Sequence, residues 1–248
     1  MKYKVEGVTP YANNKSKRGQ IIEMFDNIAP KYDKLNGILS MGVDNYWRRD
    51  AIKELKKYAP KSIIDIATGT GDFALLANSV LKPEKIVGVD ISKGMLEVGE
   101  EKVARRGLQN DISFEVQDSA DMTFEDNAFD AATISFGVRN FEDIDKSFKE
   151  ILRILKPGGV FLFIELTSPE KNPMKKMYQS YTKYVMPKLA GIMKTEQQAY
   201  EYLPDSIAAF PEGREMMLIL QKNGYTNIRL RRYTLGIATL YIAEKPLD

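Results

Sequence analysis

The feature that most constrains the fold is a repeated alternation of apolar, β-branched runs with helical patterns from residue 59 onward. The apolar runs cover residues 62–67, 85–89, 112–116, 129–135 and 160–166. Strands that alternate with helices form βαβ units around a parallel sheet, and nearly continuous apolar strands are covered on both faces. We therefore expect an α/β fold with a doubly wound, mostly parallel sheet.

The segments on either side of this pattern predict two additions to the sheet. Residues 1–58 begin with a polar stretch, which we interpret as a mobile N-terminal arm, and continue as a helical lid with breaks at Pro30 and around Asn36-Gly37. Residues 59–248 form the Rossmann-like domain. An inserted helical cap is expected at about 170–205, and a closing strand pair at 227–233 and 237–244.

The composition excludes several classes of protein. With 36 basic and 34 acidic residues the net charge is only +2, whereas a nucleic-acid-binding protein usually has a clear basic excess. The absence of cysteine excludes disulfides, thiolate nucleophiles and zinc–thiolate sites, and the absence of histidine removes the commonest general base. We expect no metal. No apolar stretch suggests a signal peptide or a membrane span, so the sequence predicts a cytoplasmic protein.

A glycine loop, Asp65-Ile66-Ala67-Thr68-Gly69-Thr70-Gly71-Asp72, joins the first strand to the first helix of the sheet. Ligands of doubly wound sheets bind at this edge, and glycines let them approach the backbone closely. The spacing Gly69-x-Gly71-x-x-Ala74 also fits a dinucleotide fingerprint. The glycines alone therefore do not distinguish NAD from S-adenosylmethionine.

Carboxylates around the loop favour S-adenosylmethionine. A pyrophosphate at the helix N-terminus would face Asp72, whereas the ammonium and sulfonium groups of S-adenosylmethionine suit both Asp65 and Asp72. Asp90 ends the second strand, where a carboxylate can accept both ribose hydroxyls. After the third strand, Asp118-Ser119-Ala120 could accept the adenine amino group and bond a ring nitrogen.

Four segments match a known pattern: Phe25-Asp26 through Asn36 and Ser40-x-Gly42 to Trp47-Arg48; Gly69-Thr70-Gly71-Asp72; Ile134-Ser135-Phe136-Gly137-Val138-Arg139-Asn140; and Arg153-Ile154-Leu155-Lys156-Pro157-Gly158-Gly159 leading to Glu165-x-Thr167. The chain thereby resembles the ubiquinone/menaquinone biosynthesis C-methyltransferases, over nearly everything from Phe25 onward. The resemblance implies the class I S-adenosylmethionine-dependent methyltransferase fold. It also implies cofactor contacts at Thr70, Asp90, Ser119 with Ala120, and Ser135.

Two departures from the family pattern affect the mechanism. The family often has histidine where this chain has Asp44, and again where Phe210 precedes Pro211. Neither position can supply an imidazole base here.

The resemblance implies methylation of demethylmenaquinol, a prenylated quinol, at a ring carbon made electron-rich by loss of a phenolic proton. Arg139 is our candidate for stabilising the phenolate or ordering a water, and Asn140 for orienting the ring. Tyr32 and Asp33 would close the pocket or polarise a hydroxyl. A ubiquinone-pathway benzoquinol stays open as substrate, and an NAD-dependent oxidoreductase stays open as a different class of enzyme.

The expected cap is rich in Met, Tyr and Lys. Its apolar residues, which recur at near-helical spacing, either pack on the sheet or form a gate for a prenyl tail: Met174, Met177, Tyr178, Tyr181, Tyr184, Val185 and Met186. Its lysines would face anionic lipid headgroups in a transient contact with the inner face of the membrane: Lys171, Lys175, Lys176, Lys183 and Lys188. We expect no nucleic-acid partner, and an oligomer stays open.

Overall fold

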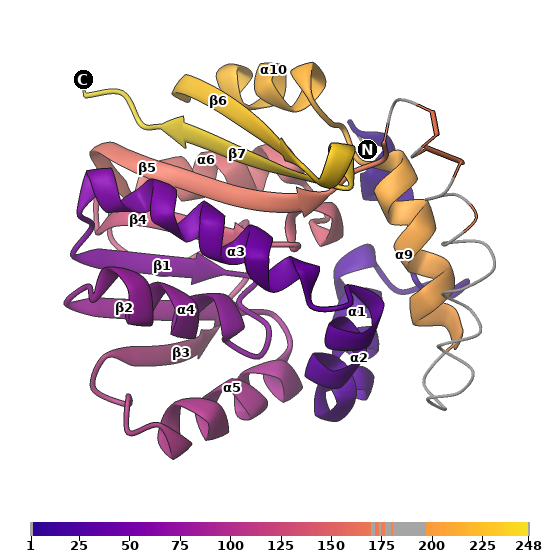
Figure 1. The fold of residues 1–248 in the computed structure, drawn as a ribbon, viewed down its shortest axis with the longest axis horizontal. Coiled ribbons are helices and arrows are strands. Elements are labelled where there is room, and N and C mark those ends of the chain that lie inside the picture. Colours follow the sequence, from indigo (N-terminus) through magenta and orange to yellow (C-terminus); the bar gives the residue numbers. More distant parts are fainter. Residues whose placement is uncertain (1, 170–171, 174, 177–179, 181–196, 248) are drawn as a thin grey trace.

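A mixed sheet of seven strands forms the centre of the part of the chain that the computed structural model describes, residues 2–169, 172–173, 175–176, 180 and 197–247 (Figure 1). The strand order is β3-β2-β1-β4-β5-β7-β6. Strands β1 to β5 run parallel, and β7 is antiparallel to both β5 and β6. The bounds are β1 Ser62–Ile66, β2 Lys85–Asp90, β3 Ile112–Val116, β4 Phe129–Ser135, β5 Leu155–Leu166, β6 Thr226–Tyr233 and β7 Ala238–Glu244. The expected doubly wound, mostly parallel sheet is confirmed.

Helices cover both faces of the sheet because successive strand residues point to opposite sides. Ile63 packs under α3 (Val43–Glu54) and α4 (Asp72–Leu81), whereas its neighbour Ile64 packs under α6 (Ile144–Ile154) and α10 (Arg214–Lys222). Helix α5 (Lys93–Arg105) lies beside α4 at the β3 edge of the sheet (Figure 1). Helices thus bury an apolar core on each face of the sheet, and the strand ends between them hold the residues that follow the strands.

Helices α1 (Lys17–Ile28), α2 (Tyr32–Leu39) and α9 (Gln197–Ala209) lie beyond the carboxyl ends of the parallel strands, at the right of Figure 1. The helix break predicted at Pro30 is confirmed, because a 3-10 turn over Ala29–Lys31 separates α1 from α2. The break predicted at Asn36-Gly37 is wrong. Helix α2 continues through both residues, and the chain turns instead at Gly42, whose φ is 76°.

The N-terminal segment is docked on the fold, which corrects the expectation of a mobile arm. A 3-10 helix, η1 (Lys4–Gly7), places the completely buried Val5 in the core below α6. The Glu6 carboxylate accepts hydrogen bonds from the backbone of Lys2, Tyr3 and Ile144. Hydrogen bonds of this polar stretch therefore hold it against the rest of the fold.

Strand β5 contains the turn expected at Lys156-Pro157-Gly158-Gly159. Pairing with β4 passes from Phe129↔Leu155 directly to Ala131↔Val160, so these four residues bulge out of the ladder. Gly158 has a φ of 73°, and a Cβ on Gly159 would lie 2.7 Å from the carbonyl oxygen of Lys156. The turn is thus a bulge within an extended strand.

Only part of the expected cap belongs to the described residues. Helix α9 is its C-terminal portion, and Lys175 and Lys176 are exposed. The other predicted cap residues lie outside the described residues: Lys171, Met174, Met177, Tyr178, Tyr181, Lys183, Tyr184, Val185, Met186 and Lys188.

Candidate active site at the carboxyl ends of the strands

The glycine loop adopts a conformation that side chains would obstruct. Gly69 and Gly71 have φ values of 56° and 77°, and a Cβ on Gly71 would lie 2.6 Å from Cζ of Phe114. The Asp90 carboxylate accepts hydrogen bonds from the amides of Gly69 (2.8 Å) and Ser92 (2.9 Å). Asp90 therefore fixes the loop to the start of α5, and burial raises its pKa.

A pocket with mixed polar and apolar walls opens beside this loop, at the carboxyl ends of β1, β2 and β4. Six of the predicted cofactor residues line it: Gly69, Asp90, Asp118, Ser119, Ala120 and Ser135. The apolar side chains of Ile91 and Met95 contribute another wall. We call this space the donor pocket. It brings together an acid at the end of β2 and a polar loop after β3, as the sequence predicts for a nucleoside site.

An ion pair closes one side of the donor pocket. Arg18 of α1 donates from Nε to the Asp118 carboxylate at 2.6 Å, and the other oxygen of Asp118 accepts from the amide of Ala120 at 2.9 Å. Arg18 also lines the pocket. The expected adenine-binding carboxylate thus already has two partners within the protein. The sequence pattern missed Arg18 because it belongs to the stretch interpreted as a mobile arm.

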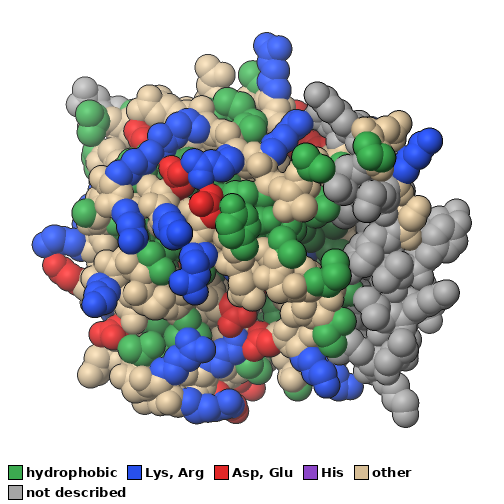
Figure 2. Space-filling view, in the orientation of Figure 1, with side chains coloured by type: hydrophobic (Ala, Val, Ile, Leu, Met, Phe, Trp, Pro, Cys, Tyr) green, Lys and Arg blue, Asp and Glu red, His purple; other side chains and the backbone are tan. Residues whose placement is uncertain are grey.

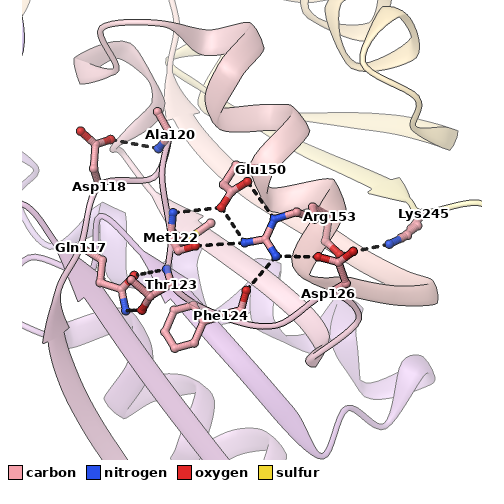
Figure 3. Close-up of polar contacts among 10 residues, drawn as sticks. All are labelled: Gln117, Asp118, Ala120, Met122, Thr123, Phe124, Asp126, Glu150, Arg153 and Lys245. Carbon is pink, nitrogen blue, oxygen red and sulfur yellow. Dashed lines mark hydrogen bonds and ion pairs between the residues drawn. The ribbon is translucent and has the colours of Figure 1, made fainter.

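Arg153 anchors the loop that carries Asp118, as Figure 3 shows. Its guanidinium donates to the backbone oxygens of Met122 (3.0 Å) and Phe124 (2.7 Å), and it pairs with Glu150 and Asp126. Glu150 in turn accepts from the amide of Met122. This network fixes the path of residues 118–126 from outside the pocket and so positions its polar wall.

Three predicted cofactor residues lie outside the lining of both described pockets. Asp65 is buried, and its carboxylate accepts from the hydroxyls of Thr68 (2.5 Å) and Thr133 (2.6 Å). Burial raises the pKa of Asp65 to about 6. Gly71 caps α4, and Thr70 is bonded elsewhere, as described below. Asp65, Thr70 and Gly71 therefore hold the glycine loop in its conformation and do not line either pocket.

A second, mostly apolar pocket adjoins the donor pocket, and we call it the acceptor pocket. Its walls come from α2, α3, α9 and the turn after β6, and they include Leu39, Trp47, Leu203, Ile207 and Ile237. Tyr32 and Phe136 line both pockets. A ligand in either space therefore meets these two aromatic side chains at the boundary.

Arg139 lines the acceptor pocket and is held in a buried ion pair. Its Nη1 lies 2.6 Å from Oε1 of Glu165, whose side chain is completely buried, and it also donates to the backbone oxygen of Phe136. Burial alone would lower the pKa of Arg139, but the interactions around it, with Glu165 foremost, together outweigh burial and raise that pKa. The guanidinium is therefore cationic and oriented, and its Nε–H is left without a partner among the described residues.

Asn140 follows Arg139 but lines the donor pocket, and its Oδ1 accepts a hydrogen bond from the Tyr202 hydroxyl of α9 at 2.9 Å. The two residues predicted to act together thus lie on either side of the pocket boundary. Tyr202 joins the cap to this boundary, a link that sequence spacing did not indicate.

Asp33 lies outside both pockets and binds α2, part of the helical lid, to the glycine loop and α5. Its carboxylate accepts from the Thr70 hydroxyl (2.6 Å) and pairs with Lys102 of α5 (2.7 Å). Lys102 also contacts Asp72 at the start of α4. Of the two roles predicted for Asp33, this geometry favours closing the pocket.

Arg48 is a further residue between the pockets. Its Nε donates to Ser135 Oγ at 3.0 Å, its guanidinium lies 5.4 Å from the centre of the Phe136 ring, and its Nη1 lies 3.4 Å from Asp44. Asp44 is thus a partner for a buried cation. Taken together, the site can hold a polar nucleoside against an apolar ring, with Arg139 stabilising negative charge.

Comparisons with known proteins agree with this geometry. The model of the ubiE/COQ5 methyltransferase family matches residues 12–245. A demethylmenaquinone methyltransferase of Bacteroides fragilis is 49% identical over 99% of this chain and 100% of its own length. A ubiquinone/menaquinone biosynthesis C-methyltransferase UbiE of Geotalea daltonii is 42% identical over 91% and 96% of the two chains. The solved structure of the [4+2]-cyclase SpnF shares the fold, with a TM-score of 0.71 and 16% identity over 94% of this chain and 98% of that one.

Proposed function

The chain belongs to the ubiE/COQ5 methyltransferase family, and we propose that it methylates a ring carbon of demethylmenaquinol to give menaquinol. The observation that carries the proposal is the shared wall of Tyr32 and Phe136 between the donor pocket, which carries the polar groups for a nucleoside, and the mostly apolar acceptor pocket. A methyl donor and an apolar quinol would meet there. The full-length similarity to demethylmenaquinone methyltransferases supports this substrate.

S-adenosylmethionine fits the donor pocket. Asp90 offers a carboxylate for ribose hydroxyls, the Gly69 backbone leaves room for close approach, and Ile91 and Met95 offer apolar walls for a base. When bound, the cofactor supplies an electrophilic methyl group. Because that group is already activated, the protein chiefly needs to position and orient the acceptor.

The residues of the acceptor pocket would prepare the quinol for attack. Arg139 would stabilise the phenolate formed by loss of a phenolic proton, because its charge is fixed by Glu165 and its Nε is unsatisfied among the described residues. Asn140 would orient the ring at the boundary, and Tyr32 would close over it. The reaction needs no metal in this proposal.

The prenyl tail of the substrate would extend along the apolar walls of α3 and α9. No described helix is long and apolar enough to cross a membrane. We therefore propose a cytoplasmic enzyme that meets its substrate at the inner membrane surface. No nucleic-acid partner is part of this proposal.

Incubation with methyl-labelled S-adenosylmethionine and chemically reduced demethylmenaquinone tests the function, with mass spectrometry of the quinone product. Label in the ring methyl group is the expected result, and Arg139→Ala should lower the turnover number while leaving cofactor affinity intact in calorimetry. Cofactor binding without labelled naphthoquinol would refute the substrate assignment. The benzoquinol suggested by the UbiE relatives would then be tested.

A further inference from the structure

Two exposed apolar side chains stand at turn tips in a backbone conformation that disfavours them. Met41 has a φ of 51° and is 77% exposed, and Leu235 has a φ of 57° and is 75% exposed. The left-handed region suits Gly, Asn and Asp, and it is strained for bulky residues. At each position a strained backbone conformation therefore holds an apolar side chain in water. Backbone strain of this kind is concentrated at functional sites.

Both tips lie at the edge of the acceptor pocket. Met41 itself lines the pocket, and Leu235 lies in the 3-10 turn η6 (Thr234–Gly236), whose Thr234 lines it too. Tyr46, 65% exposed, lies one turn into α3, with its ring against Tyr233. Figure 2 shows hydrophobic side chains gathered around a hollow in the middle of this face. We call Met41, Val43, Tyr46 and Leu235 the apolar rim.

Exposed basic residues lie on α2 and α3, the helices on either side of Met41. Lys34 of α2 and Arg49 and Lys53 of α3 are exposed, and no ion pair engages them within the described part of the chain. The acidic residues of the same two helices are paired with protein cations: Asp33 with Lys102, Asp44 with Arg48, and Asp50 and Glu54 with Arg231. The net effect around the rim is unneutralised positive charge.

We propose that the apolar rim docks on a phospholipid bilayer containing anionic lipids, so that the tail of the quinol passes from the bilayer into the acceptor pocket. This inference rests on the proposed function, since a prenylated quinol resides in the bilayer. Apolar side chains enter the interfacial region while flanking cations attract anionic headgroups. A tyrosine at the rim suits the headgroup level. The docking surface thus surrounds the entrance that the substrate uses.

Vesicle binding tests the surface without any quinol. The full chain would be sedimented with vesicles of neutral phospholipid alone or of neutral and anionic phospholipid mixed. The variant Leu235→Asn with Tyr46→Gln removes two rim side chains that do not line the pocket. Asn tolerates the left-handed conformation, so the fold should persist. Leu218→Gln is the control, because Leu218 is exposed (53%) but lies on α10.

We expect the wild type to bind mixed vesicles and the rim variant to bind about tenfold more weakly, as two apolar side chains leave the interface. The Leu218→Gln control should bind like the wild type. With a tail-less quinol in solution, the rim variant should keep its turnover. With long-chain quinol in vesicles, the rim variant should lose most of its turnover.

Three outcomes would overturn the docking surface. One is that the wild type does not bind mixed vesicles. Another is that the Leu218→Gln control loses as much vesicle binding as the rim variant. The third is a dimer that dissociates in the rim variant while vesicle binding is absent, because the rim would then join two copies of the chain. Failure to methylate the tail-less quinol would instead refute the proposed function, which the vesicle measurement does not involve.

Discussion

Replacing Asp65 by Asn should stabilise the protein and weaken its cofactor binding. The Asp65 carboxylate is buried and accepts from two threonine hydroxyls, and no cation of the described residues is in hydrogen-bond contact with it. An asparagine side chain has nearly the same shape, and both hydroxyls can rotate to serve it. The substitution therefore removes a buried charge while leaving the packing in place.

The size and sign of the change in unfolding free energy follow from the pKa of Asp65, which is about 6 in the fold and 3.8 for the ordinary carboxyl group. A difference of about 2 pKa units corresponds to about 3 kcal/mol of unfolding free energy. Because the folded pKa is raised, ionisation destabilises the fold at full strength above pH 6, and this penalty disappears as the pH falls to about 4. The variant should gain about 3 kcal/mol at pH 7.5, or ~6–12 °C in melting temperature for a chain of this size.

Asp130→Asn is the matched control with the opposite sign. Although burial raises the pKa of Asp130, bonds from Lys156 and the amides of Ser62 and Lys61 bring it down to about 2. Its ionised form stabilises the fold above pH 4, and that contribution is lost as the pH falls toward 2. The control should lose about 2 kcal/mol at neutral pH.

Urea denaturation from pH 4 to pH 8 measures the pH dependence of Asp65→Asn and the loss in Asp130→Asn at neutral pH, and calorimetry measures the ligand affinities. Asp65→Asn should weaken S-adenosylmethionine binding more than binding of S-adenosylhomocysteine, since only the former carries the sulfonium charge. A loss of stability at pH 7.5 in Asp65→Asn would refute the reasoning, because the carboxylate would then act as a stabilising partner.

Three further substitutions test the supports of the site. Glu165→Ala should cost about 3–5 kcal/mol in denaturant unfolding, because it leaves Arg139 charged and buried without its partner; a cost below about 1 kcal/mol would show that water replaces the carboxylate. Arg153→Met should raise the KM for S-adenosylmethionine with little change in kcat, since it releases the loop after β3, and an unchanged KM would argue against a positioning role. Lys102→Met should loosen Asp33 and the lid, so amides of α2 should exchange hydrogen faster while those of β1 do not; equal protection in both proteins would mean that Lys102 does not fasten the lid.

The sequence was sufficient for features set by local chemistry. The strands, the glycine loop and Asp90 at the end of β2 follow from periodicity and from the backbone freedom of glycine. The helix break at Asn36-Gly37 failed because a glycine inside a helix costs only about 1 kcal/mol. Leu35 is buried in α2, and burial of an apolar side chain can offset such a cost.

The contacts that complete the site could not be predicted, because they join residues remote in sequence. Arg18 meets Asp118 across 100 positions, and Lys102 meets Asp33 from the interior of an ordinary amphipathic helix. Glu165 was visible in a family pattern, but its pairing with Arg139 depends on the register of β4 and β5. Residue identity gave the chemistry of these groups, and only the fold gave their partners.

The docked N-terminal segment constrains the order in which the protein can mature during synthesis. Lys17 donates from its buried amino group to the backbone oxygens of Val5 and Arg139, and the Tyr3 hydroxyl donates to Asp145. Translation releases residues from the N-terminus first, so these early residues wait unpaired while more than a hundred others emerge. The segment that braces Arg139 is therefore made first and seated late. The nascent chain remains without a complete site until the ribosome has passed the turn after β6, because Thr234 and Ile237 line the acceptor pocket.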